Sequence, residues 1–304
     1  MPIRPLSSTV SVILGTVVGA VFFLAGYLLC VGDHESYGVA MFLLMPALSG
    51  LAIAVVVKRA SLLASCCVMA MIIGMGLLVG TGFEGYICVL MALPIVIVSM
   101  AFGALLGYFA RQYVLDEGPH EQRSKLLLLL VIPFVMAASH QLERPTISRQ
   151  RIETFSSQIH VETSPPKTWK RLARMPHMMG EQPLLLRAGL PVPYQCTLDV
   201  EAVGGIRTCH FNQGIIRQQV TEWQPPRRME VDIVESTLPG RKWLTFVDAS
   251  YDLIPEGEGT RVVRRSTIAS RLYPRWYWRP FEAWGVQSEH TFVLSTLAVA
   301  GNPD

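Results

Sequence analysis

The stretch that decides the fold is Val203–Ser236, VGGIRTCHFNQGIIRQQVTEWQPPRRMEVDIVES. It predicts three consecutive antiparallel strands, because turn residues divide it at short intervals. Two glycines precede the first apolar run, Asn-Gln-Gly ends that run, and Gln-Pro-Pro separates the second run from the third. Glycine supplies the positive φ of tight turns, and proline removes a donor from a strand ladder. The stretch is therefore expected to form the middle of a curled sheet.

The composition of the whole chain divides it into two unlike parts. The chain has 304 residues, of which 51% are hydrophobic, and its mean hydropathy is +0.36. Nearly all the long apolar runs lie in residues 10–140, whereas residues 141–304 have the composition of a water-soluble domain. The net charge of +3 is modest, and no basic cluster is interleaved with aromatic residues. These features argue against a nucleic-acid partner.

Five apolar stretches in the first part are candidate membrane spans, and none of them contains Asp, Glu, Lys or Arg. They are Val10–Val31, Val39–Val57, Ser61–Gly82, Tyr86–Ala110 and Leu126–Leu142. The first four have the roughly 20 apolar residues that a bilayer core requires. The fifth is shorter and contains Pro133. The first is expected to be a retained anchor rather than a cleaved signal peptide, because it is long and further spans follow it.

Small residues recur four positions apart in several of these spans. The steps are Gly15/Gly19, Gly50/Ala54, Gly76/Gly80 and Gly103/Gly107. Such steps let helix backbones approach closely in lipid, so a compact bundle is expected. The same steps could also bind a membrane partner or a second copy of the chain. Carriers and pumps usually keep ionisable groups inside the membrane, and these spans contain none of the four charged types. The bundle is therefore interpreted as an anchor or a partner-binding platform.

The charges of the loops predict how the spans are oriented. Basic residues flank the spans at Arg4, Lys58, Arg59, Arg111, Arg123 and Lys125, while the loops 32–38 and 83–85 hold acidic residues and no Lys or Arg. The positive-inside rule then places the N-terminus in the cytoplasm. Five crossings would place the C-terminal domain on the external or periplasmic side. The short fifth span and the arginines that follow it leave the side of this domain open.

The second part is expected to be an α+β domain. The boundaries are a transmembrane domain at 1–142, a linker at 143–153 and the second domain at 154–300. Alternation and turn residues predict a first strand at Thr154–Val161 and a helix opened by Pro165, with a second short helix or loop after it. Six strands follow, and a long helix covers about Arg275–Ala300. This order indicates an antiparallel sheet wrapped around a long C-terminal helix.

The segment Ile159–Leu297 resembles the SRPBCC superfamily, the START-like group with polyketide cyclase/dehydrase and lipid-transfer domains. The resemblance rests on the order and spacing of six stretches: Val161–Trp169, Gly189–Pro193, Val203–Phe211, Val220–Arg228, Gly259–Val263 and Tyr273–Trp278. It covers about half of the chain and does not include the membrane spans. The resemblance implies a helix-grip fold with a deep apolar cavity between sheet and long helix, where a hydrophobic ligand binds.

The lining of that cavity is predicted from periodicity. Alternate residues of the strand near 243–253 share one face, and the long helix has large residues at helical spacing. The candidate ligand-binding residues are Trp243, Thr245, Val247, Tyr251, Phe281, Trp284, Ser288 and Phe292. All six tryptophans lie in this domain, and the alternative reading is that they fill an ordinary core.

The sequence contains no convincing catalytic or metal-binding arrangement. His210, Glu222, Asp232 and Asp248 lie on expected strands, but alternation alone does not tell which of them point inward. No Gly-x-Ser-x-Gly, His-Glu-x-x-His or phosphate-binding loop is found, and the seven histidines have no ligand spacing. No cofactor or metal is therefore predicted, and enzyme activity stays open.

Cys196 and Cys209 lie on strands that are expected to be neighbours. With residues 201–205 as the connecting loop, Cys196 faces His210, one residue away from Cys209. A disulfide between the two would require a slipped register or a bulge. The remaining four cysteines fall in the spans.

Taken together, these features predict a membrane-tethered module that binds a lipid or another hydrophobic small molecule. Two alternatives remain open. One is a cyclase- or hydrolase-type enzyme that uses the same cavity, and this requires two titratable groups within hydrogen-bond reach inside it. The other is a protein-interaction domain whose core is filled.

Overall fold

The computed structural model describes residues 8–32, 38–81, 84–112, 121–147, 150–180, 182–241 and 243–299. The chain forms two compact units, which are described separately below. The first contains the chain up to residue 149 together with 271–274, and the second contains residues 150–270 and 275–304. Of the residues that predict the orientation, Arg4, positions 33–37 of the first acidic loop and position 83 of the second lie outside the described part.

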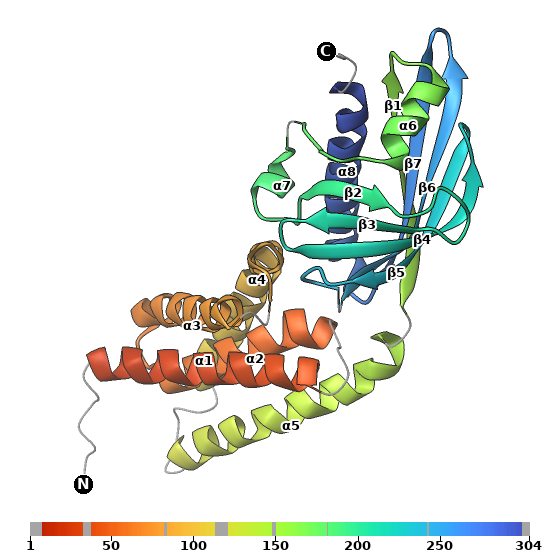
Figure 1. The fold of residues 1–304 in the computed structure, drawn as a ribbon. Helices are drawn as coiled ribbons and strands as arrows, with labels where there is room; N and C mark the ends of the chain where they lie inside the picture. Colours follow the sequence, from red (N-terminus) through yellow and green to blue (C-terminus); the bar gives the residue numbers. More distant parts are fainter. Residues whose placement is uncertain are drawn as a thin grey trace. The chain divides into compact units, whose positions relative to one another are not determined.

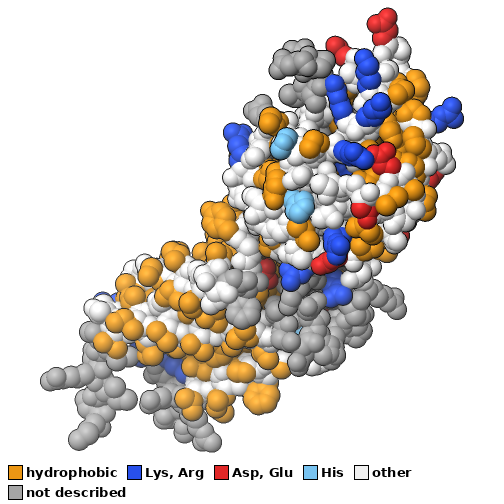
Figure 2. All heavy atoms as spheres, in the orientation of Figure 1, with side chains coloured by type: hydrophobic (Ala, Val, Ile, Leu, Met, Phe, Trp, Pro, Cys, Tyr) orange, Lys and Arg blue, Asp and Glu red, His pale blue; other side chains and the backbone are white. Residues whose placement is uncertain are grey.

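The first unit consists of helices (Figure 1). They are α1 (Ser8–Gly32), the π-helical segment η1 (Ala40–Leu44), α2 (Met45–Val56), α3 (Ala60–Gly80), α4 (Tyr86–Ala110) and α5 (Glu121–Ile147). Four stretches are long and apolar enough to cross a membrane: Ser8–Cys30, Ala60–Gly80, Tyr86–Ala110 and Ser124–Glu143. Figure 2 shows apolar side chains spread over the visible face of this unit, as a lipid-facing surface requires.

One of the five predicted spans is shorter than expected, and it is the second rather than the fifth. The continuous helix formed by η1 and α2 covers only Ala40–Val56. At 1.5 Å per residue it is about 25 Å long, compared with a hydrocarbon core of about 30 Å. By length and composition, four helices of the described part could therefore cross a membrane.

Charged side chains cap both ends of this short helix. The Glu143 carboxylate accepts hydrogen bonds from the backbone N–H groups of Val39 and Ala40, at 2.6 and 2.7 Å. At the other end, the buried Arg111 guanidinium donates to the backbone carbonyls of Ala54, at 2.9 Å, and of Val57. An anion at the N-terminus and a cation at the C-terminus match the helix dipole and satisfy backbone groups that have no intrahelical partner.

Glycines allow α2 and α4 to pack backbone against backbone. A Cβ atom added at Gly103 would overlap the carbonyl oxygen of Ala47, and one added at Gly50 would overlap that of Met100. At Gly107 the added atom would lie 2.7 Å from the Ala54 Cβ. The steps Gly103/Gly107 and Gly50/Ala54 thus face each other inside the unit.

The other two small-residue steps behave differently from each other. Gly15 and Gly19 on α1 pack against the side chains of Val57 and Ile53. Gly76 and Gly80 on α3 have no atom within 4 Å of an added Cβ among the parts of the chain that the structure describes. The glycine steps therefore hold the bundle together at every place except α3.

The second unit is a seven-stranded antiparallel sheet that curls around one long helix (Figure 1). The strand order is β1-β7-β6-β5-β4-β3-β2. The strands are β1 (Arg151–Val161), β2 (Pro193–Leu198), β3 (Ile206–Phe211), β4 (Gly214–Gln224), β5 (Arg228–Ser236), β6 (Leu244–Glu256) and β7 (Gly259–Ser270). The helices are α6 (Pro165–Ala173), α7 (Leu184–Arg187) and α8 (Arg275–Val299). This is the predicted helix-grip architecture, and the stretch Val203–Ser236 supplies the consecutive strands β3, β4 and β5. These three lie between β6 and the edge strand β2, so only β5 is at the middle of the sheet.

The element bounds differ from the prediction mainly at the connector. The linker expected at 143–153 is largely regular structure, because α5 continues to Ile147 and β1 begins at Arg151. Arg151 and Glu282 form an ion pair that joins the start of β1 to α8. Ser270 at the end of β7 also donates to Glu282, at 2.5 Å. These contacts fix the helix to one edge of the sheet.

The sheet bends where bulges interrupt its register. Register shifts occur in β2 between Pro193 and Gln195, at two places in the pairing of β4 with β5, and in β6 between Phe246 and Asp248. A bulge inserts one residue into a strand, which bends it and increases its twist. It also exchanges the two faces of the strand beyond that point.

The close α2–α4 contact leads to a first prediction. Gly103→Ala should lower the unfolding temperature of the protein in detergent, because the new methyl group must push α2 away, at a cost of about 1–3 kcal/mol. Thermal unfolding followed by circular dichroism would measure this. Gly76→Ala is the matched control, and it should be neutral or stabilising by up to about 1 kcal/mol, since alanine favours helices. Equal unfolding temperatures for the two variants would contradict the packing described above.

Candidate functional site

A small cavity lies in the second unit, within the curve of the sheet and against α8. Its volume is about 30 Å³, which is room for roughly one or two water molecules. The apolar part of its lining is formed by Met178, Phe211, Ile216, Ile233, Phe246, Ala249 and Val293, next to the disulfide Cys196–Cys209. The polar part is formed by Arg207, Gln218, Tyr251, Arg264, Ser266 and Glu289. The cavity is thus smaller and more polar than the family resemblance implied.

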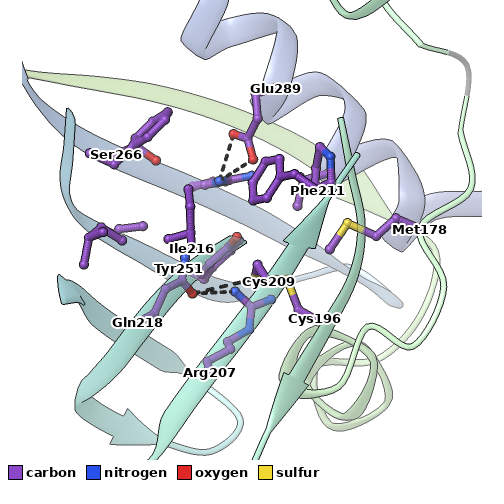
Figure 3. A pocket seen from close by; sticks show the side chains of 16 residues that line it. Met178, Cys196, Arg207, Cys209, Phe211, Ile216, Gln218, Tyr251, Ser266 and Glu289 are labelled. Carbon is purple, nitrogen blue, oxygen red and sulfur yellow. Dashed lines mark hydrogen bonds and ion pairs between the residues drawn. A yellow bond between two sulfur atoms is a disulfide. The ribbon is translucent and has the colours of Figure 1, made fainter. Parts of the chain in front are cut away.

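Two buried arginines dominate the polar side of the cavity. Arg207 comes from β3 and Arg264 from β7, and both guanidinium groups lie over the ring of Tyr251, at 5.9 and 5.3 Å from its centroid. Aromatic faces attract cations, most strongly where water is excluded. Figure 3 shows Arg207 and Gln218 on the sheet side of Tyr251, and Glu289 reaching in from the helix.

The two arginines differ in their partners. Arg264 Nη2 donates to the Glu289 carboxylate at 2.9 Å. Burial is the largest single influence on the pKa of Arg264 and lowers it, but the Glu289 carboxylate and Tyr251 together outweigh burial and the pKa is raised. Arg207 Nη1 donates to the neutral Gln218 Oε1 at 2.9 Å, and its Nη2 lies 3.8 Å from the Met175 sulfur. Burial lowers the pKa of Arg207.

Several donors of these arginines are buried without an acceptor. Within the described residues, Arg207 Nε and the Nε and Nη1 atoms of Arg264 make no hydrogen bond. A guanidinium group stays protonated in proteins, so its free N–H groups cannot be removed by titration. Unsatisfied buried donors are rare in folded proteins, and each one calls for an explanation.

The disulfide Cys196–Cys209 joins β2 to β3 beside the cavity, with the two Cα atoms 4.1 Å apart. The predicted register was wrong by one residue, because Cys196 pairs directly with Cys209 and Leu198 pairs with Arg207. The reason is that β2 ends earlier than predicted. The Asp199 carboxylate closes the connecting loop by accepting the N–H of Ile206 at 2.6 Å, so the loop begins at Asp199.

A buried histidine lies between two serines next to the cavity. His290 on α8 is fully buried, with Nε2 2.9 Å from Ser266 Oγ and Nδ1 3.1 Å from Ser157 Oγ. Burial, together with the charge of Arg264, lowers the pKa of His290 to about 2. A general base works best when its pKa is near the working pH. A pKa this low makes His290 a weak general base for the Ser266 hydroxyl at neutral pH.

Of the eight predicted ligand-binding residues, Tyr251 lines this cavity. The bulge between Phe246 and Asp248 explains the difference on β6. Beyond the bulge Ala249 and Tyr251 line the cavity, as alternation predicts, but before it Phe246 lines the cavity, and Val247 is 38% exposed. Trp243 and Thr245, which precede the bulge, are partly buried and do not line the cavity.

On α8 the cavity is lined by Glu289 and Val293 rather than by the predicted residues. Ser288 and Phe292 are buried, and Phe292 belongs to the apolar core. Trp284 is 44% exposed, and Phe281 packs against the ring of Tyr277. The helix face that lines the cavity is thus offset by one residue from the predicted face, with Glu289 in place of Ser288 and Val293 in place of Phe292.

The four strand residues considered for catalysis also lie elsewhere. Glu222 belongs to an ionic cluster around Arg228, which includes Asp252. Asp232 and Asp248 are cross-strand neighbours, and the ring of His210 lies 6.1 Å from that of Tyr194. None of the four lines the cavity. Within the described part of the chain, no group of three His, Cys, Asp or Glu residues is placed to hold a metal.

Comparison with known proteins concerns the second unit. Residues 153–300 match the model of the family described as polyketide cyclase / dehydrase and lipid transport. The C-terminal half of the chain is thus a polyketide cyclase/dehydrase (SRPBCC-type) domain. This family suggests that the domain binds a hydrophobic ligand. No curated protein matches the chain.

Several solved structures are similar in fold. An uncharacterized protein from Rhizobium leguminosarum is 11% identical, with 49% of this chain and 96% of that chain covered and a TM-score of 0.34. A protein from Rhodobacter sphaeroides is 16% identical, with coverages of 50% and 96% and a TM-score of 0.35. Norcoclaurine synthase from Thalictrum flavum, solved with dopamine and hydroxybenzaldehyde, is 12% identical, with coverages of 52% and 92% and a TM-score of 0.34.

The environment of His290 predicts a specific loss of stability in acid. Its pKa is about 2 in the folded protein and about 6.5 when unfolded. Between these values the unfolded chain binds one more proton, so stability falls as the pH drops below 6.5. His290→Gln should flatten this dependence between pH 6.5 and 4.5 by up to about 1.4 kcal/mol per pH unit.

Denaturant unfolding of the full chain, followed by tryptophan fluorescence, would measure this slope, because all six tryptophans belong to the second unit. His177→Gln, at an exposed histidine, is the matched control. A wild-type slope in His290→Gln would show that His290 does not carry the acid sensitivity.

Proposed function

We propose that the chain is a membrane-tethered module that binds a lipid or another hydrophobic small molecule. In this proposal residues 1–142 anchor the chain in the bilayer through their apolar helices, 143–153 form the connection, and 154–300 bind the ligand. The observation that carries it is the cluster of unsatisfied buried donors at the cavity of an SRPBCC-type domain. Ligand sites typically combine an apolar wall with a few polar groups that are free to bind the ligand, and structural rules are most often broken at functional sites.

The enzyme alternative has less support from the same residues. It needs an acid–base pair inside the cavity. The two candidate pairs are Arg264–Glu289, which is an ion pair, and His290–Ser266, in which the histidine pKa is about 2. Neither pair can exchange a proton readily at neutral pH. Binding without chemistry therefore fits the cavity better.

The size of the cavity sets a condition for this proposal. A space of about 30 Å³ is far below the roughly 300–1,000 Å³ of a pocket for a drug-sized ligand. A whole lipid therefore requires the cavity to widen, and Met178 in its wall is a flexible side chain of the kind that adapts to ligands. A core that stays closed would favour the protein-interaction alternative instead.

Native mass spectrometry of the full chain released from detergent would test the binding proposal. The expected result is a fraction of the protein that carries an apolar molecule of defined mass. Ala249→Leu, in the wall of the cavity, should lower the bound fraction several-fold, because a larger side chain occupies the space. Ala202→Leu, in the loop between β2 and β3, is the matched control and should retain the wild-type fraction. Failure of the wild-type protein to retain any molecule would argue against the binding function.

We further propose that the second domain lies on the external or periplasmic side. Helix lengths alone allow four crossings, which would return the chain to the side of its N-terminus. The loop charges favour five crossings, with the capped helix η1–α2 as the additional one. The disulfide Cys196–Cys209 supports five, since disulfides persist in oxidising compartments and are rare in the cytoplasm. The Gly76/Gly80 step on α3 would be available to a membrane partner or a second copy.

Thiol labelling in intact cells would test this placement. In a variant whose four other cysteines are replaced by serine, a membrane-impermeant maleimide should label the protein only after an impermeant reductant opens the disulfide. Labelling that requires permeabilised cells would place the domain in the cytoplasm. Labelling without a reductant would show that the two thiols are free.

A further inference from the structure

The cavity of the second unit carries more positive than negative charge. Two guanidinium groups, Arg207 and Arg264, face one carboxylate, Glu289, among the charged residues that line it. Glu289 is engaged by Arg264. His290 beside them adds no charge at neutral pH, because its pKa is lowered to about 2. The described wall of the cavity therefore has a net charge of one positive unit.

That charge is on Arg207, which is 1% exposed. Its contacts are the amide oxygen of Gln218, the sulfur of Met175 and the ring of Tyr251, all of which are neutral. In the described part of the chain no carboxylate lies within ion-pair distance of it, and Glu289 raises its pKa only through charge at longer range. Its Nε is buried without an acceptor. A buried charge with no ionic partner is strongly unfavourable unless an anion joins it.

We propose that Arg207 recognises the carboxylate head of an amphipathic ligand, with Gln218 and Tyr251 holding its guanidinium group in place. This inference rests on the proposed binding function and names the chemical class of the ligand. The planar fork of arginine donates two parallel hydrogen bonds to a carboxylate. A single excess charge matches a monoanion.

The dimensions of the cavity favour a carboxylate over a phosphate head. A volume of about 30 Å³ accommodates a planar group with two oxygens more readily than a tetrahedral group with four. The wall next to the polar cluster is apolar, with Ile216, Phe246 and Val293 among its residues. The closed cavity has room for the head group alone, so an alkyl or aryl chain attached to the carboxylate would follow this wall only once the cavity has widened.

Binding of decanoate and of decanol to the full-length protein in nanodiscs tests the inference. The two probes have the same chain length and differ in the charge of the head group. Isothermal titration calorimetry should show decanoate binding at least tenfold more tightly than decanol, as expected for charge-assisted hydrogen bonds. Arg207→Gln should abolish this preference, and Arg207→Lys should restore part of it.

Arg217→Gln is the matched control, because Arg217 is an exposed arginine on the neighbouring strand β4. It should retain the wild-type preference. If Arg207→Gln does not fold, the wild-type protein alone still provides a test, because decanoate should raise its unfolding temperature more than decanol does.

The possible results separate the head-group inference from the binding proposal. Equal affinity of the wild type for both probes would overturn the role of Arg207 while leaving apolar binding intact. Binding of neither probe would count against the proposed function itself. Acetate that binds as tightly as decanoate would overturn the amphipathic ligand and leave only a site for small carboxylates.

Discussion

A buried positive charge is the constraint on which the second unit depends. Arg207 and Arg264 flank Tyr251 between the sheet and α8, and Glu289 neutralises only Arg264. Holding these groups away from water requires the large apolar core around them, which includes Leu172, Met229 and Leu297. A filled apolar interior would be simpler to build and at least as stable. The polar cluster thus costs stability that the proposed recognition of a ligand would account for.

The helical unit solves a comparable problem at the ends of its shortest helix. The backbone groups at a helix end have no partners of their own, and in apolar surroundings water cannot supply them. Glu143 and Arg111 fill this need with charges that suit the dipole. The close crossing of α2 and α4 at Gly50 and Gly103 then holds the capped helix inside the bundle. A helix of only this length can thus be accommodated among apolar neighbours.

The sequence predicted the architecture well and the residues that line the cavity poorly, for one physical reason. Strands, turns and the long helix follow from local patterns, so the order of elements and the helix-grip fold were recognised. The identity of the inward-facing residues depends on register, and one bulge after Phe246 exchanged the two faces of β6. The early end of β2 at Leu198 likewise moved Cys196 opposite Cys209. Arg207 and Glu289 carry no sequence signal of their own, because only the fold shows that they are buried.

The excess positive charge bears on both the enzyme alternative and the binding proposal for the cavity. Together with burial, the charge of Arg264 keeps His290 neutral, and so deprives the His290–Ser266 pair of the basicity that a catalytic dyad needs. The same excess favours an anion at Arg207. Weak general-base chemistry and the proposed affinity for a carboxylate therefore follow from one charge distribution. A carboxylate bound there would reduce the positive field at His290, but the histidine would remain desolvated, and desolvation is the larger cause of its low pKa. Binding of a carboxylate would therefore not make His290 basic enough to act as a general base.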